Sequence, residues 1–312
     1  MSRFDEQYLD LCHRILDHGE KITTDPAVLA KKTKSATATN MPTHLAQVEK
    51  PTTTFSLPHE VLTFDLAEEF PILTTKQVAF KTSVLEMLWI YQVASNDVSW
   101  LHSRGVKIWD EWEIPSDGLY AGKDFKKLYK EKGIKGDPAG TIGTAYGWIV
   151  DRYHLVESLI ETLKTDPANR RMIMSLWQNE WLETAALPSC VWNSQWNVTG
   201  GKLNLMVTVR SNDVPLGMPF NVSQYATLCY LLAQVTGLKP GKMTYVINNA
   251  HIYENQVAGI KEQFTRSAFP APQLWINPEI TDFYQFDNSK ELKDIRLENY
   301  QHAGRIVMPV TE

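Results

Sequence analysis

The segment 191–209 constrains the fold of this chain more than any other part of the sequence. In its second half apolar residues occupy every other position, namely Leu203, Leu205, Val207 and Val209. This period of two is typical of a strand with one buried face. The Gly200-Gly201 pair in the middle favours a tight turn. The sequence therefore predicts two long strands joined at 199–202.

Helices are predicted both before and after these strands in the sequence. Residues 4–18 place apolar side chains on one face and end at Gly19, as an amphipathic helix does. Further helices are expected at 83–94, 154–164 and 222–236, a buried strand at 172–177, and a long loop at 31–59 with one short strand near 52–55. Because helices and strands alternate irregularly, we expect an α/β fold of the α+β type, with one large mixed β-sheet covered by helices on one face. No linker divides residues 1–312, so a single domain is expected.

A lysine-rich segment interrupts this pattern between about residues 115 and 140. Its polar, glycine-containing stretch holds Lys123, Lys126, Lys127, Lys130, Lys132 and Lys135. We interpret the segment as a surface insertion rather than a domain. A solvated excursion is the simpler explanation, and a dedicated binding role is the alternative.

Composition narrows the class of protein. With 43% hydrophobic and 21% charged residues the chain fits a globular protein, and no apolar run reaches the roughly 18 residues of a membrane span. The first residues lack the apolar core of a signal peptide, so a cytoplasmic location is expected. Three widely spaced cysteines form neither a disulfide nor a zinc pattern, and we expect no metal. The net charge of −5 argues against a protein whose whole surface binds nucleic acid. It does not exclude a local basic pocket.

Cys190, Arg210 and Asn221 lie close together in the sequence. Alone, a cysteine entering an apolar strand is more often a small buried side chain than a nucleophile. Reactivity requires a nearby positive charge that lowers the pKa of the thiol, and Arg210 on the adjacent strand is the candidate. Asn221 is either the N-cap of the following helix or a ligand-binding amide with one donor and one acceptor side by side.

Glu86 is the most anomalous residue by pattern, because it lies in the almost entirely apolar run 84–91. A helix of that kind has no polar face unless this one position points into a cleft. The carboxylate is then either paired structurally or raised in pKa for proton transfer, and a cleft favours the second.

Three blocks of the sequence resemble the signature motifs of the thymidylate synthase family. They are Leu187-Pro188-Ser189-Cys190, the run from Arg210-Ser211-Asn212-Asp213 to Pro219-Phe220-Asn221, and His251-Ile252-Tyr253. The likeness extends from about residue 5 to the C-terminus. It implies a homodimer, with the second face of the sheet in the dimer interface, that methylates dUMP to dTMP. The implied co-substrate is 5,10-methylenetetrahydrofolate, which would supply both carbon and hydride without a metal.

The resemblance also implies a role for each matched residue. Cys190 would attack C6 of uracil, Glu86 would transfer protons through water, and Tyr146 would orient removal of the C5 proton. Asn221 would bind N3–H and O4 of uracil, whereas an aspartate there would suggest a cytidylate substrate. The residues implied at the nucleotide are Arg170 and Arg171 from the partner subunit, with Arg210, Ser211, Asp213, Asn221, His251, Tyr253 and Lys32. Those implied at the folate are Lys76, Ile108, Trp109, Trp112, Asp213, Leu216, Gly217 and Phe220.

Simpler explanations exist for several of these residues. Arg170 and Arg171 lie where a loop meets a strand, and arginines there are usually solvated. Lys76 could be a surface lysine, and the aromatic cluster at 108–112 could belong to the core. A lone histidine such as His251 is most often a hydrogen-bonded core residue.

The sequence departs from the usual family pattern at several positions. Val191 follows the nucleophile where most members carry histidine, Val209 replaces a glutamine before Arg210, and Asn248-Asn249 stand where Gly-Asp is more usual. The N-terminal phosphate-binding arginine is missing, and Lys32 is the predicted substitute. A lysine donates as a point charge rather than a fork, so a different grip on the phosphate is expected.

Two other functions stay open at this level. Glu312 ends a tail that closes over the ligands in the family, and an imperfect lid would admit water. A deoxyuridylate hydroxymethylase, in which water replaces hydride in the last step, is therefore one alternative. The other is an RNA-binding or regulatory protein with a vestigial site, in which residues 115–140 contact phosphates.

Overall fold

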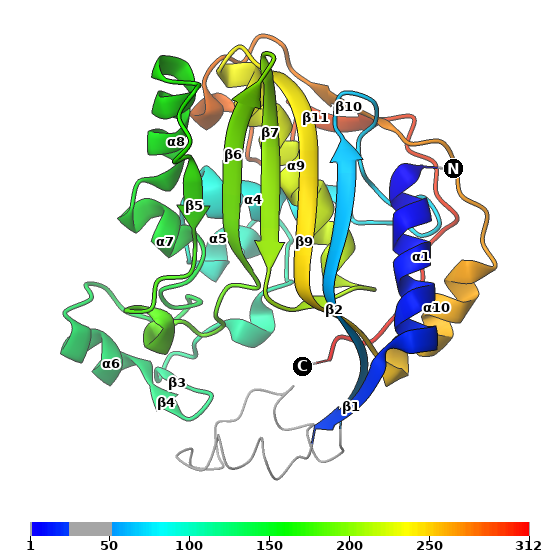
Figure 1. Ribbon diagram of the computed structural model, residues 1–312. Coiled ribbons are helices and arrows are strands. Elements are labelled where there is room, and N and C mark those ends of the chain that lie inside the picture. The colour runs from blue at the N-terminus through cyan, green and yellow to red at the C-terminus, as the bar shows by residue number, and fades with distance from the viewer. Residues whose placement is uncertain (1, 25–51, 312) are drawn as a thin grey trace.

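One seven-stranded mixed β-sheet organises the computed structural model, which describes residues 2–24 and 52–311 (Figure 1). Strands follow the order β1-β2-β9-β7-β6-β5, and β8 pairs with β9. β9 runs parallel to β7 and β8, while the other neighbouring pairs are antiparallel. The predicted mixed sheet is therefore confirmed. Its strands are β1 (Glu20–Thr24), β2 (Thr52–Asp65), β5 (Ile173–Ser175), β6 (Val191–Thr199), β7 (Lys202–Val209), β8 (Asn212–Asp213) and β9 (Lys239–Tyr253), and β10 (Gln273–Ile276) pairs separately with β11 (Ile295–Glu298).

The predicted pair of strands at 191–209 is the hairpin of β6 and β7. Gly200 and Gly201 in its turn have φ angles of 59° and 73°, which residues with a Cβ rarely adopt. Next to the first pair of the ladder, the backbone N–H of Arg210 donates to the carbonyl of Cys190 at 3.0 Å. The hairpin therefore holds Cys190 and Arg210 side by side, as predicted.

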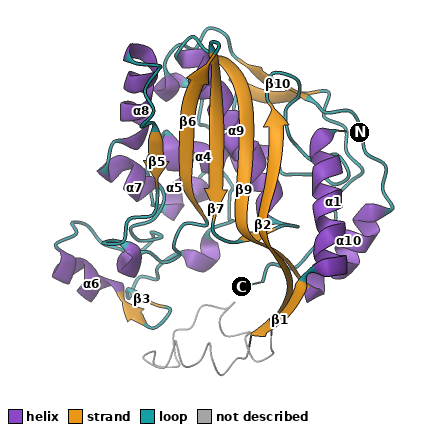
Figure 2. Ribbon diagram, viewed as in Figure 1, coloured by secondary structure: helices purple, strands orange, loops and turns teal. Residues whose placement is uncertain are grey.

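Helices cover one face of this sheet. Figure 2 shows α4 (Phe80–Tyr91) and α9 (Gly217–Val235) behind the long strands, whose front face carries no helix. α9 is apolar nearly all round because it contacts β7 and β9 on one side and α4 on the other. No helix within 2–24 and 52–311 is long and apolar enough to cross a membrane. The remaining helices are α1 (Arg3–His18), α5 (Val98–His102), α6 (Phe125–Lys132), α7 (Gly147–Arg152), α8 (Leu155–Thr165) and α10 (Val257–Phe264), with short 3₁₀ helices at Asp110–Trp112, Leu182–Thr184, Glu254–Gln256 and Phe283–Gln285.

Most helix predictions hold, but some boundaries differ. α1 ends before Gly19 as expected, whereas α4 begins at Phe80 and ends at Tyr91 rather than at residue 94. α9 begins at Gly217, not at residue 222. Pro219 is tolerated in its first turn because the backbone N–H groups there have no intrahelical partner. The earlier start places Asn221 inside the helix.

The prediction of a loop over 31–59 is wrong at its C-terminal end. Thr52 to Asp65 form the long strand β2, which pairs with β9 from Thr54 to Asp65. Leu62 and Phe64 point into the core and alternate with the exposed Val61 and Thr63. Pro58 lies beyond the stretch that β1 covers, where β2 is an edge and tolerates proline. Lys32 lies outside the described residues.

The lysine-rich segment folds into a small unit with apolar residues of its own. β3 (Leu119–Tyr120), β4 (Lys123–Asp124) and α6 enclose a cluster of Ile114, Tyr120, Phe125 and Tyr129. Three of its lysines donate to backbone carbonyls: Lys123 to Glu183, Lys126 to Ser116 and Lys132 to Glu180. The bonds of Lys123 and Lys132 connect the segment to residues 180–183, while that of Lys126 lies within it.

Candidate active site

Cys190 lies immediately before β6, at the end of the hairpin where Arg210 follows β7. One guanidinium nitrogen, Nη2 of Arg210, is 3.6 Å from the sulfur. The same guanidinium donates to the carbonyls of Pro188 at 2.8 Å and Ser189 at 3.1 Å, which fixes its orientation. A permanent positive charge beside the sulfur stabilises the thiolate, the form of cysteine that attacks carbon.

Tyr146 connects the backbone of Cys190 to Trp109 on the other side of the site. Its hydroxyl oxygen accepts from the backbone N–H of Cys190 at 3.0 Å, and its ring meets that of Trp109 edge to face at 5.2 Å. Burial raises the pKa of Tyr146 well above its usual value, so the phenol stays neutral. The following Gly147 cannot be replaced, because a Cβ there would lie 2.0 Å from the carbonyl oxygen of Ser95.

Glu86 is the one residue of α4 between Ser83 and Tyr91 that is not fully buried, as its sequence pattern predicted. Oε1 accepts from the indole N–H of Trp109 at 2.7 Å, and Oε2 accepts from Nε2 of Gln224. Burial raises the pKa of Glu86 to about 7, although both hydrogen bonds lower it. A carboxyl group with this pKa can both give and take a proton near neutral pH.

Asn221 lies in the first turns of α9 and is not its N-cap, a position that Leu216 holds. The N-cap alternative is therefore wrong. Its Oδ1 accepts from Nδ2 of Asn212 at 3.4 Å, while its Nδ2 donates to Oε1 of Gln224 at 3.3 Å. Oδ1 also lies 3.5 Å from the hydroxyl of Tyr245, which donates to Oδ1 of Asn212 at 2.8 Å. The two contacts at Oδ1, at 3.4 and 3.5 Å, are the longest, so a ligand that offers a closer donor can replace them.

A second cluster of polar side chains, Ser211, Asn249 and His251, lies where the end of β9 meets the loop after β7. His251 lies near the end of β9, and its Nδ1 is 2.9 Å from Oδ1 of Asn249 and 3.5 Å from Oγ of Ser211. Burial lowers the pKa of His251 to about 4, so the ring is neutral at pH 7. Because the amide oxygen of Asn249 only accepts, Nδ1 carries the proton and Nε2 is the acceptor. The ring of Tyr253 packs edge to face against His251 at 5.1 Å, which confirms that the two share one face of the strand.

Asp213 and Lys76 lie on the side of α9 that faces the C-terminal tail. Oδ1 of Asp213 accepts from the backbone N–H of Leu216 at 2.9 Å, and Oδ2 accepts from Nε2 of Gln256 at 2.8 Å. Burial raises the pKa of Asp213 above its ordinary value. Lys76 donates to the carbonyl of Pro215, and burial lowers its pKa to about 8. Only 6% of Lys76 is exposed, so the surface-lysine alternative is wrong.

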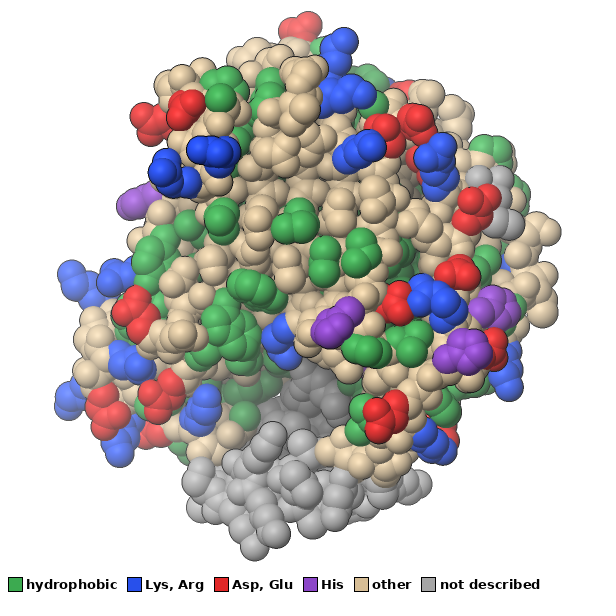
Figure 3. All heavy atoms as spheres, in the orientation of Figure 1, with side chains coloured by type: hydrophobic (Ala, Val, Ile, Leu, Met, Phe, Trp, Pro, Cys, Tyr) green, Lys and Arg blue, Asp and Glu red, His purple; other side chains and the backbone are tan. Residues whose placement is uncertain are grey.

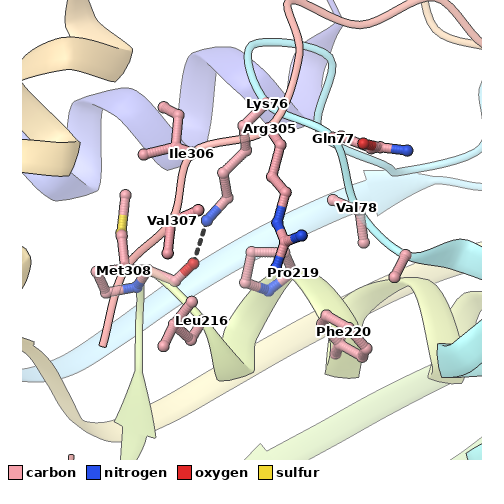
Figure 4. A pocket seen from close by; sticks show the side chains of 12 residues that line it. Lys76, Gln77, Val78, Leu216, Pro219, Phe220, Arg305, Ile306, Val307 and Met308 are labelled. Carbon is pink, nitrogen blue, oxygen red and sulfur yellow. Dashed lines mark hydrogen bonds between the residues drawn. The ribbon is translucent and has the colours of Figure 1, made fainter. Parts of the chain in front are cut away.

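A cavity of about 450 Å³ opens between α9 and the C-terminal tail. Figure 4 shows Lys76 and Arg305 above its floor of Leu216, Pro219 and Phe220. The tail is held there by two side chains, since Gln256 donates to the carbonyl of Pro309 at 3.3 Å and Asn255 donates to Oγ1 of Thr311 at 2.9 Å. An apolar floor with cationic groups above it suits a flat aromatic ligand that carries a negative charge.

The other candidates are distributed around these groups. Trp112 packs edge to face on Trp109 at 5.4 Å, and Ile108 packs against the core nearby. Gly217 begins α9, and a Cβ there would lie 3.3 Å from Nδ2 of Asn212. Arg170 and Arg171 are exposed on the loop before β5, where Asn169 accepts from the backbone N–H of Arg171 at 2.8 Å.

Comparison with known proteins shows the family of this chain. The family model described as thymidylate synthase matches residues 6–312. The chain belongs to the thymidylate synthase family. It is 46% identical to a thymidylate synthase of Clostridium beijerinckii, with all of both chains covered, and 37% identical to one of Bacillus mojavensis, with 99% of each covered. The solved structure of thermostable thymidylate synthase A from Bacillus subtilis superposes with a TM-score of 0.79 at 36% identity, over 98% of this chain and 99% of that one.

Several residues that contact these groups or line the cavity were not predicted from the sequence, among them Tyr245, Gln256, Arg305 and Gln224. Gln224 lies 4% exposed on α9 and bonds to both Glu86 and Asn221. The signal that identified Glu86, a lone polar residue in an almost entirely apolar run, is absent for Gln224, because Asn221, Ser223 and Thr227 are polar neighbours on the same helix.

Proposed function

We propose that the chain methylates C5 of dUMP to give dTMP, with 5,10-methylenetetrahydrofolate converted to dihydrofolate. The observation that carries this proposal is the thiol of Cys190 3.6 Å from Arg210 in a site that also holds Glu86, a carboxyl with a pKa of about 7. Tyr146 and Trp109 link the two residues: Tyr146 accepts from the backbone N–H of Cys190, its ring packs against that of Trp109, and the indole N–H of Trp109 donates to Glu86. A soft nucleophile and a neutral-range acid–base group are what substitution at C5 of uracil requires.

The chemistry at the base begins at Cys190. Its sulfur forms a bond to C6, and the electron pair of the C5–C6 double bond moves toward O4, which makes C5 nucleophilic. Asn221 accepts from N3–H and stabilises the charge on O4 by donation. Glu86 moves protons to and from O4 and the folate through water, and Tyr146 orients removal of the proton from C5. Breaking the sulfur–C6 bond at the end restores the double bond and the thiolate.

The remaining nucleotide contacts follow from charge and hydrogen-bonding type. Arg210 and Ser211 offer a guanidinium and a hydroxyl to the phosphate dianion. We assign Arg170 and Arg171 of the partner subunit and Lys32 to the same phosphate. The neutral His251 and the hydroxyl of Tyr253 bind the 3′-hydroxyl of the ribose.

The cavity beside α9 fits a folate. Leu216, Phe220 and the cluster of Ile108, Trp109 and Trp112 supply apolar and aromatic surface for its rings. Asp213 accepts from the pterin, Gly217 lets the backbone approach closely, and Lys76 faces the distal, anionic part. When bound, the folate supplies the carbon unit and the hydride, while the chain holds it, excludes bulk water and moves its protons through Glu86.

Mass analysis of the nucleotide product tests this function. Purified protein with dUMP and 5,10-methylenetetrahydrofolate should convert dUMP into a product heavier by one CH₂, with one dihydrofolate formed for each dTMP. A product that carries a hydroxymethyl group would instead establish the hydroxymethylase. No product, together with RNA retention that decreases with salt and survives Cys190→Ala, would establish a binding protein.

We also infer that the helix-free face of the sheet is the interface of a homodimer. Val61 on β2 is 55% exposed and Ile173 on β5 is 51% exposed, and Figure 3 shows further hydrophobic side chains on this face. An apolar sheet face of this kind is expected to be covered. Arg170 and Arg171 precede β5 at the edge of the same sheet, from which they can reach a partner's site.

Mixing two inactive variants tests the shared site. A double variant, Arg170→Ala with Arg171→Ala, and Cys190→Ala should each be nearly inactive alone. After subunit exchange the mixed dimer holds one complete site, so activity should return to about a quarter of the wild-type level at equal amounts. Light scattering before and after mixing verifies the dimer. Exchange without any recovery of activity would contradict the assignment of both arginines to the partner's phosphate.

A further inference from the structure

Gln224 connects Glu86, the acid–base group of the site, to the side-chain amide of Asn221, which binds the pyrimidine. It lies on α9, one helical turn after Asn221, and only 4% of it is exposed. Its Nε2 donates to Oε2 of Glu86, and its Oε1 accepts from Nδ2 of Asn221 at 3.3 Å. The three side chains therefore form one continuous hydrogen-bonded chain.

We propose that Gln224 is a positioning residue that orients the amide of Asn221 and thereby makes the site select uracil over cytosine. This inference rests on the proposed function, because it concerns the same nucleotide site. It adds a residue that touches neither the reacting carbon nor the phosphate.

The donor and acceptor order in this row of hydrogen bonds follows from the carboxyl group of Glu86 at its end. Nε2 of Gln224 donates to Oε2 of Glu86. In its ionised form this carboxyl only accepts hydrogen bonds, so whenever Glu86 is ionised the NH₂ of Gln224 faces Glu86 and its oxygen faces Asn221. That oxygen in turn requires the NH₂ of Asn221. Turning either amide would place two oxygen atoms against each other, which costs the hydrogen bond and leaves a buried acceptor unsatisfied.

This order determines what Asn221 offers to a base. With Nδ2 held by Gln224, Oδ1 is turned toward Nδ2 of Asn212 and the hydroxyl of Tyr245, at 3.4 and 3.5 Å. These long contacts can yield to a closer donor. Uracil presents N3–H as a donor, whereas N3 of cytosine is an acceptor and would face Oδ1 with a lone pair. The orientation set by Gln224 therefore favours uracil.

Few groups around Glu86 affect its pKa, so the hydrogen bond from Gln224 has a large effect on it. From α4 itself Tyr91 faces the carboxyl, from the loop before α7 Tyr146 does, and burial raises the pKa of both phenols, so both stay neutral. The groups that lower the pKa of Glu86 against burial are the donors Trp109 and Gln224. Loss of Gln224 removes one of these two donors, and the pKa of Glu86 should rise further.

Gln224→Met tests the inference, since methionine keeps the length of the side chain without either hydrogen bond. We expect the ratio of dCMP to dUMP dissociation constants, measured by calorimetry, to fall about tenfold. The limb of the pH–rate profile that reports Glu86 should move up by about one pH unit. Gln234→Met is the matched control: it removes from the same helix a glutamine that donates to the carbonyls of Asn277 and Ile280 at 2.8 Å. It should leave the ratio and the profile unchanged.

A second variant separates the two bonds. Gln224→Glu retains an oxygen for Asn221 but places a second carboxyl beside Glu86, so the selectivity for dUMP should persist while the pH limb moves upward. Wild-type selectivity in Gln224→Met, or its loss in Gln224→Glu, overturns the inference. The binding ratio decides this even if no variant turns over. Absence of dTMP from wild type and Gln234→Met would instead count against the proposed function alone.

Discussion

Replacing Cys190 by alanine should lower kcat by on the order of 10⁴-fold or more, because the other two thiols of the chain, Cys12 and Cys229, are buried and cannot form the bond to C6. Arg210 and Ser211 would still be present, so dUMP should still bind. Release of tritium from [5-³H]dUMP reports the step directly, since hydrogen leaves C5 only after C6 has been attacked. We expect no release above background from this variant.

Cys229→Ala provides the matched control. Cys229 is fully buried on α9, donates to the carbonyl of Leu203 at 3.5 Å, and burial raises the pKa of its thiol to about 12. Its removal can cost stability but should leave tritium release intact. With 5-fluoro-dUMP and the folate, wild type should form a covalent adduct that peptide mapping assigns to Cys190. An adduct at Cys12 or Cys229, or full tritium release from Cys190→Ala, would sink the proposed mechanism.

Local patterns were sufficient for the parts of the fold that place Cys190 beside Arg210. Alternation at Leu203 to Val209 and the Gly200-Gly201 turn predicted a hairpin, and the register of a hairpin determines which residues face each other. Glu86 was predicted by the same kind of reasoning, since one carboxylate in an apolar helix must have a polar environment.

Long-range packing explains what the sequence alone did not predict. β2 has few apolar residues and contains Pro58, and it becomes a long strand because β9 pairs with most of its length. Lys76 resembles a surface residue until the loop of Pro215 and the C-terminal tail cover it. Gln224 acquires its role only when α4 brings Glu86 against α9, a contact between residues far apart in the chain.

Glu86→Gln should lower kcat by about 10²- to 10⁴-fold, the usual contribution of a general acid–base group, with much less effect on dUMP binding. The change removes proton transfer but keeps the size of the side chain. The pH–rate limb near 7 should disappear in the variant, because that limb reports the ionisation of this carboxyl. Steady-state kinetics from pH 5.5 to 9 measure both effects. A kcat within about threefold of wild type at pH 7 would exclude Glu86 as the acid–base group.

The stability of Glu86→Gln shows whether its loss of kcat comes from lost proton transfer or from a damaged fold. Folding raises the pKa of Glu86 from about 4.5 to about 7, so the folded protein binds more protons than the unfolded chain between these values. The stability of wild type should therefore be highest below pH 4.5 with respect to this group and decrease as pH rises to 7, by about 2 to 3 kcal/mol. Glutamine does not ionise, so Glu86→Gln should gain stability relative to wild type when urea unfolding at pH 8 is compared with pH 5. If Glu86→Gln is slower but more stable than wild type at pH 8, the buried carboxylate destabilises the fold and catalysis depends on its ionisation. If the two proteins show parallel dependences of stability on pH, the pKa of Glu86 is not raised.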